Sequence, residues 1–145
     1  MIINTAAEGI SFSRKLENDS AAFYEAEARV YHQFSEALMT FARENKKFIA
    51  QIEQTYYQAI TDAIEGCFAL DLETDDYIPD MGNKTSVRKY AFIEQAVRME
   101  EVIQQFYLKA GEQSKSLMAD VSRSFIMTAR KHKARLTQLA GLQSA

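Results

Sequence analysis

Apolar residues recur at steps of three and four along most of the chain, the spacing that gives an α-helix one buried face. Four stretches show it, at about 5–33, 35–65, 86–110 and 113–139. Their apolar faces are Ile10, Ser13, Ala21, Tyr24, Ala28 and Tyr31; Leu38, Phe41, Phe48, Ile52, Tyr56 and Ala59; Ile93, Val97, Ile103 and Tyr107; and Leu117, Val121, Phe125, Thr128 and Leu139. The pattern predicts four long helices.

Capping and helix-breaking residues suggest where these helices end. "TAAE", beginning at Thr5, is a capping-box pattern in which Thr5 accepts a backbone hydrogen bond and Glu8 reaches back. Ser35 predicts a cap between the first two helices. Gly66 and Gly111 predict the ends of the second and third helices.

The connections between the helices predict the topology. Short turns join the first helix to the second and the third to the fourth, so each pair forms an antiparallel hairpin. The segment from Gly66 to Thr85 holds the only proline and is long enough to cross the bundle. The sequence therefore predicts an all-α fold, an antiparallel four-helix bundle with one long crossover between helices 2 and 3, as a single domain over 1–145.

Composition excludes several classes of protein. The net charge is −3, with acids and bases interspersed, so no basic face indicates nucleic-acid binding. Cys67 is the only cysteine, so neither an intrachain disulfide nor a cysteine-pair metal site is expected. No run of 18 apolar residues predicts a membrane span, and "MIINTAAEG" does not resemble a secretory signal. We expect a cytoplasmic protein.

Each predicted helix carries a polar or charged residue within its apolar face. These residues are Glu17 in the first helix, Asn45 in the second, Glu100 in the third, and His132 and Arg135 in the fourth. We therefore expect them to face one another inside the bundle.

The two halves of the chain repeat one pattern. "LENDSAAFY" at 16–24 matches "MEEVIQQFY" at 99–107, with an apolar residue, Glu and then Phe-Tyr at the same spacing. "ARENKKFI" at 42–49 matches "ARKHKARL" at 129–136 in its Ala-Arg opening and in the Lys at its fifth position. The joint match is much harder to obtain by chance than either aromatic pair alone.

Over nearly its whole length the chain resembles the rubrerythrin-like branch of the ferritin-like superfamily. In that family the first and third helices each supply a Glu and the second and fourth each supply Glu-x-x-His, which together hold two iron or manganese ions. The resemblance implies peroxide, oxygen or iron chemistry at such a centre. It places Glu17 and Glu100 at the single-Glu positions.

The Glu-x-x-His positions have lost their ligands in this sequence. They fall on Asn45 and Phe48 in the second helix, and on His132 and Arg135 in the fourth. Phe48 cannot bind a metal, and Arg135 puts a fixed positive charge where an ion would sit. The resemblance therefore implies a degenerate di-iron site.

Three functions follow, and we favour the first. The first is a non-catalytic relative with no cofactor, in which Glu17 and Glu100 pair with Arg135 and protonated His132. The second is a protein that binds one iron or manganese ion through Glu17, Glu100 and His132, as a metal-dependent oxidoreductase if it is an enzyme. The third is a module that binds an apolar ligand in an inter-helix cavity lined by Phe41, Phe48 and tyrosines.

A second apolar stripe on the first helix predicts a partner surface. It consists of Phe12, Leu16, Phe23 and Val30. Together with the family resemblance, it predicts a homodimer.

Overall fold

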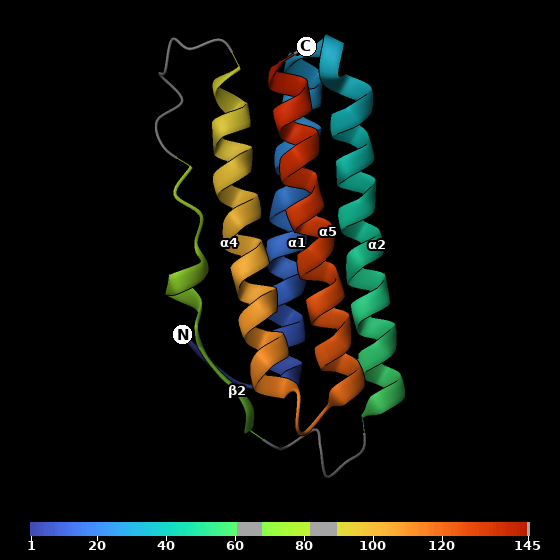
Figure 1. Ribbon diagram of the computed structural model, residues 1–145, viewed down its shortest axis with the longest axis vertical. Helices are drawn as coiled ribbons and strands as arrows, with labels where there is room; N and C mark the ends of the chain where they lie inside the picture. The colour runs from blue at the N-terminus through green and yellow to red at the C-terminus, as the bar shows by residue number, and fades with distance from the viewer. Residues whose placement is uncertain (61–67, 82–89, 145) are drawn as a thin grey trace.

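The computed structural model describes residues 1–60, 68–81 and 90–144, and over them the chain is an all-α four-helix bundle (Figure 1). The helices are α1 (Ala6–Val30), α2 (Ser35–Ala59), α4 (Ala91–Ser114) and α5 (Ala119–Gln143). The predicted fold class is confirmed. Within these residues, none of the helices combines the length and apolar character that a membrane span requires.

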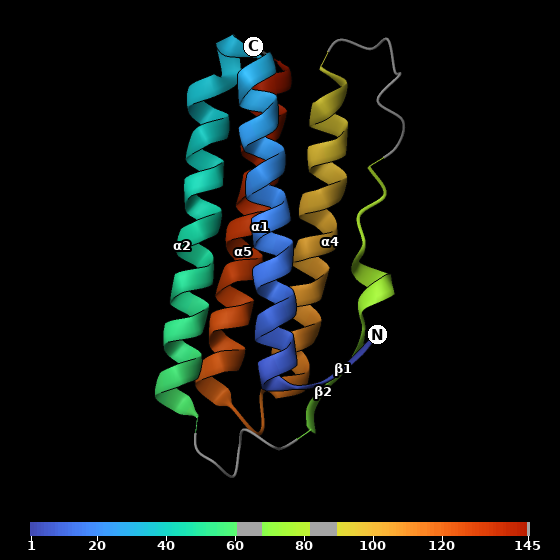
Figure 2. The same ribbon diagram turned by 180° about the vertical axis from the view of Figure 1, so that it is seen from behind.

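The direction of each helix can be followed in Figures 1 and 2. Helices α1 and α5 run one way, and α2 and α4 run the other. The packed pairs are α1 with α2, α4 with α5, α2 with α5, and α1 with α4, so every packed pair is antiparallel. The described part of the crossover, 68–81, runs along the outside of α4 towards the end of the bundle where α4 begins.

A short two-stranded β-sheet, which the sequence pattern did not predict, is part of the fold. Strand β1 (Ile2–Thr5) pairs antiparallel with β2 (Phe68–Glu73), which lies in the predicted crossover. Ile3, Leu70 and Leu72 are buried against the bundle. The two strands lie 63 residues apart in the chain, between Thr5 and Phe68, so no local hairpin signal marked them.

The capping box at the start of α1 is confirmed. Thr5 is the N-cap, its hydroxyl accepts from the Glu8 amide, and the Glu8 carboxylate accepts from the Thr5 amide at 3.1 Å. Between α1 and α2 a short 3-10 helix, η1 (His32–Phe34), replaces the last predicted turn of α1. Ser35 is the first residue of α2, and the N-cap position is Phe34.

The predicted boundaries of the other helices need correction. α2 ends at Ala59, because Ile60 is already extended, and the predicted stop at Gly66 lies outside the described residues. α4 begins after Tyr90, which has a left-handed backbone (φ 63°), and the predicted start near Ser86 also lies outside them. α4 passes through Gly111, its predicted end, and ends at Ser114. α5 starts at Ala119, later than the predicted start at about 113.

Gly111 is a close-contact residue between α4 and α5 and does not end the helix. A Cβ atom there would lie 2.7 Å from Ile126 Cγ1 and 3.2 Å from the Ser122 carbonyl oxygen. The Ser122 hydroxyl donates to the Gly111 carbonyl at 2.6 Å. Glycine lets the two helices approach at this point, which is a reason for glycine that helix-stop rules do not consider.

This contact predicts opposite effects for two glycine substitutions. Gly111→Ala should destabilise the fold by about 1–3 kcal/mol, because the added methyl group must displace Ile126. Gly141→Ala, in α5 with nothing within 4 Å of the new methyl group, should stabilise it by about 0.5–1 kcal/mol. Urea unfolding of both variants provides the measurement. Stabilisation by both would contradict the tight contact at Gly111.

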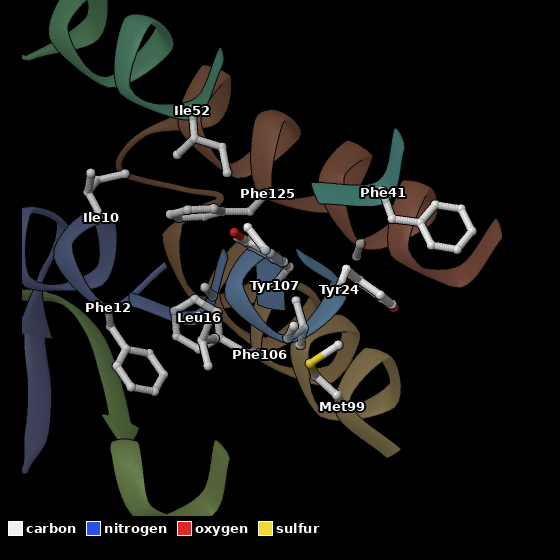
Figure 3. Packing of buried hydrophobic residues seen from close by; sticks show 14 of the residues in the cluster. Ile10, Phe12, Leu16, Tyr24, Phe41, Ile52, Met99, Phe106, Tyr107 and Phe125 are labelled. Atoms are coloured by element: carbon white, nitrogen blue, oxygen red, sulfur yellow. The ribbon is translucent and has the colours of Figure 1, made fainter. Parts of the chain in front are cut away.

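The core lies between the four helices and includes most residues of the predicted faces. Figure 3 shows Tyr24 beside Phe41 and Tyr107 beside Phe125, with ring centroids 5.2 and 5.9 Å apart. Leu117 is an exception, because it lies in the turn before α5 and is 40% exposed, whereas the neighbouring Met118 is buried.

Candidate functional site

The bundle interior brings together the five polar residues that the sequence placed on inward faces. Glu17, Asn45, Glu100 and His132 are 0% exposed, and Arg135 is 1% exposed. They come from all four helices, and each sits within the apolar stripe that holds its helix in the bundle. We call these five residues the charge cluster.

His132 bridges the two carboxylates of the cluster. Its Nδ1 lies 2.5 Å from Glu100 Oε2, and its Nε2 lies 2.8 Å from Glu17 Oε2. An ionised carboxylate only accepts hydrogen bonds, so both ring nitrogens must donate, and a histidine that donates from both is protonated. Burial alone would lower the pKa of His132, but the Glu17 and Glu100 charges outweigh burial and raise the pKa to about 9.

Arg135 supplies the second positive charge, and its polar contacts are extensive. Nη1 donates to Glu100 Oε1 at 3.0 Å and to Asn45 Oδ1 at 2.5 Å. Nη2 donates to the Phe41 carbonyl at 3.2 Å and lies 3.5 Å from the partly exposed Glu44 carboxylate. Because these contacts replace water around the guanidinium, the charge can remain in the interior.

Aromatic rings enclose the same guanidinium. Its central carbon lies 5.4 Å from the Tyr24 ring centre, 5.0 Å from that of Phe41 and 5.4 Å from that of Phe48. Phe48 also packs edge-on against the His132 ring at 5.2 Å. Phe48 therefore contributes to the site as an apolar wall beside both cations, at a position where the resembled family has a ligand.

Two tyrosines join the cluster in a reciprocal way. Tyr24 of α1 donates to Glu100 of α4 at 2.6 Å, and Tyr107 of α4 donates to Glu17 of α1 at 2.9 Å. Burial, and then the adjacent carboxylate, raise the pKa of both phenols well above the usual value. Each phenol is therefore a neutral donor to its carboxylate.

The sequence pattern placed both tyrosines on apolar faces and in the repeat, but it did not predict that they donate hydrogen bonds to the two carboxylates. Their signal was already present in the spacing, because Tyr24 follows Glu17 by seven residues and Tyr107 follows Glu100 by seven. Seven residues are about two helical turns, so each Tyr lies on the same face as its Glu. The crossing of the two pairs between α1 and α4 required the structure.

The two carboxylates differ in how well they are satisfied. Glu100 receives hydrogen bonds from Tyr24, His132 and Arg135 across both of its oxygens. These interactions outweigh the effect of burial and hold the pKa of Glu100 below its usual value. Glu17 is contacted only at Oε2, and among the described residues its Oε1 is the buried side-chain polar atom without a hydrogen-bond partner.

Asn45 links the cluster to α1. Its side-chain amide donates to the Ser20 hydroxyl at 2.8 Å, while its carbonyl oxygen accepts from Arg135. The Asn45 amide group thus donates to the Ser20 hydroxyl and accepts from the Arg135 guanidinium. These two hydrogen bonds allow the neutral Asn45 side chain to be fully buried beside the charged residues.

The cluster does not fit the two-metal centre that the family resemblance implies. The carboxylates lie directly on the ring nitrogens of His132, and Arg135 approaches Glu100 to 3.0 Å as a fixed cation. Within the described ranges, no group of three or more His, Cys, Asp or Glu side chains is arranged to hold a metal ion.

Comparisons with known proteins add no further assignment. No protein-family model, curated protein or solved structure matches this chain.

Proposed function

We propose that this chain is a metal-free relative of the rubrerythrin-like branch of the ferritin-like superfamily. In this proposal, His132 and Arg135 supply inside the bundle the positive charge that two metal ions supply in that family. The chain then acts as a non-catalytic structural or regulatory module, with the cytoplasm as its expected location. The observation that carries the proposal is His132 with a carboxylate on each ring nitrogen.

The charges in the cluster support this reading. Glu17 and Glu100 carry two negative charges, and His132 and Arg135 carry two positive charges within hydrogen-bonding distance. Buried charges are tolerated when they are paired and hydrogen-bonded. The cluster is therefore balanced by its own side chains, without an ion.

The burial of the cluster argues against catalysis. Its members are at most 1% exposed, so a substrate in solution has almost no access to them, and the hollow beside Phe48 reaches Arg135 but is not lined by Glu17, Glu100 or His132. Both nitrogens of His132 are already engaged, and Phe48 covers one side of the ring. A general acid or base must reach the group with which it exchanges a proton, and this arrangement does not offer that contact.

Metal content tests the proposal directly. Protein purified from medium rich in iron and manganese should contain well under one ion per chain, because the cations of the cluster already occupy the carboxylates. Its thermal unfolding should not change when iron, manganese or a chelator is added. Two tightly held ions per chain, or a melting temperature that falls with chelator, would contradict the proposal.

A restored ligand set provides the positive control for that assay. A variant carrying Asn45→Glu, Phe48→His, His132→Glu and Arg135→His has Glu-x-x-His on α2 and α5. If these four positions correspond to the Glu-x-x-His ligands of the resembled family, this variant should take up roughly two ions per chain and gain thermal stability from them. Circular dichroism verifies that it is helical. A helical variant that binds no metal would count against this correspondence with the family's ligand positions.

A one-ion site is the second candidate, favoured by the unpartnered Glu17 Oε1. This atom is a buried acceptor in the described structure, and a cation would satisfy it. If analysis finds one ion, His132→Ala should abolish its binding, since His132 provides the nitrogen ligand of the proposed set. Binding that survives His132→Ala would place the ion elsewhere.

A further inference from the structure

A cavity of about 690 Å³ lies outside the charge cluster, between α1, α4 and the crossover. α1 contributes Phe12, Leu16 and Phe23 to its wall, and α4 contributes Met99 and Ile103. The crossover provides a third wall from Thr74 to Met81, including Ile78. Figures 1 and 2 show this segment running beside α4.

The α1 wall is most of the stripe that the sequence analysis assigned to a dimer interface. Phe12, Leu16 and Phe23 face the cavity beneath the chain's own crossover, whereas Val30 is 65% exposed and is not part of the wall. The second apolar stripe of α1 therefore has an explanation within one chain.

Three polar side chains of the wall and the Met1 ammonium already have partners, and the ammonium pairs with Glu73 at 2.7 Å. Lys15 and Asp19 at the α1 side form an ion pair of 2.7 Å. Ser20, a buried residue of the wall, accepts a hydrogen bond from Asn45. The charged groups of the wall that the structure describes are exposed and paired, and the rest of the lining is mainly apolar. A charged ligand would find no buried, unpaired countercharge there, so the lining favours an uncharged occupant.

The size of the cavity is that of a small-molecule site. Small-molecule pockets are typically about 300–1,000 Å³ and are lined mainly by apolar and aromatic side chains. Met81 and Met99 give the wall flexible side chains that can adapt to a ligand.

We propose that this cavity binds an uncharged, hydrocarbon-rich small molecule. The ligand contacts the cavity walls formed by α1, α4 and the crossover, and leaves the charge cluster untouched. This function is separate from the balance of charge inside the bundle, and either proposal can fail without the other.

Binding of neutral and charged probes with one hydrocarbon chain tests the inference. The uncharged dye N-phenyl-1-naphthylamine should bind saturably with enhanced fluorescence, and dodecan-1-ol should displace it. Dodecanoate, with the same chain and a negative charge, should displace it at least about tenfold less well at neutral pH. Unsaturable dye binding, or displacement by dodecanoate equal to that by dodecan-1-ol, would overturn the proposal.

A matched pair of substitutions locates the binding. Ile78 and Val30 are each 65% exposed, but only Ile78 lines the cavity. Ile78→Asp should weaken dodecan-1-ol binding about tenfold or more by placing a charge in the apolar wall, and Val30→Asp should leave binding unchanged. Since both side chains are mostly exposed, both variants should fold. Equal affinities for the two variants would place the binding elsewhere and refute this site.

Discussion

Replacing Arg135 with alanine is expected to destabilise the fold by about 3–5 kcal/mol at neutral pH. The substitution removes the partner that lies 3.0 Å from Glu100 and leaves three rings facing an empty space. Glu100 would then remain buried with a reduced countercharge, and one carboxylate should take up a proton. The loss measured by urea unfolding should therefore be smaller at mildly acidic pH.

A second substitution distinguishes lost charge balance from lost packing. Glu100→Gln added to Arg135→Ala should recover part of the stability, because it removes the carboxylate that lost its partner. Arg123→Ala is the control on the same helix, since Arg123 is 69% exposed and pairs with the exposed Asp120. It should change stability by no more than about 0.5 kcal/mol. A near-silent Arg135→Ala would refute the charge-replacement reading and favour the one-ion candidate.

The inward positions were readable from the sequence because a helix has a fixed period. Glu17, Glu100, His132 and Arg135 fall on stripes of core residues, and the structure brings them together. The repeat added a second constraint by pairing Glu17 with Glu100. Periodicity gives the face of a helix, but it does not give the contacts across the bundle. It could not show that Arg135 contacts Glu100 rather than Glu17.

The missed features depend on contacts between distant parts of the chain. The β1–β2 pairing joins Ile3 to Leu72, and the strands are too short to stand out as a pattern. Local rules predict a helix stop at Gly111 because they do not include its close contact with Ile126 of α5. The wall beneath the crossover likewise could not be predicted, because an exposed apolar stripe and a covered one read the same in sequence.

His132 should make the stability of the protein fall between about pH 6.5 and pH 9. Its pKa is raised from 6.5 to about 9 in the folded state, so the folded chain keeps a proton that the unfolded chain has already released. The stabilisation is fully present below pH 6.5 and is lost as the pH rises to about 9. The difference in pKa corresponds to roughly 3 kcal/mol. Glu100 acts in the opposite direction, since its lowered pKa gives stability that is lost in acid. The maximum should therefore lie between about pH 5 and pH 6.5.

The chain contains only two histidines, which makes this prediction easy to isolate. His32 is exposed in η1, so His32→Gln should leave the pH profile of urea unfolding unchanged. His132→Gln should lower stability below pH 6.5 and flatten the profile above it. Should His132→Gln not fold, ¹⁵N NMR of the wild-type ring nitrogens gives the same answer, with His32→Gln assigning the signals. A protonated His132 ring at pH 8 supports the bridged cluster, because an ordinary histidine is neutral there. A neutral ring at pH 8 would mean that His132 does not donate to both carboxylates, and the cluster would then lack one of the two positive charges assigned to it.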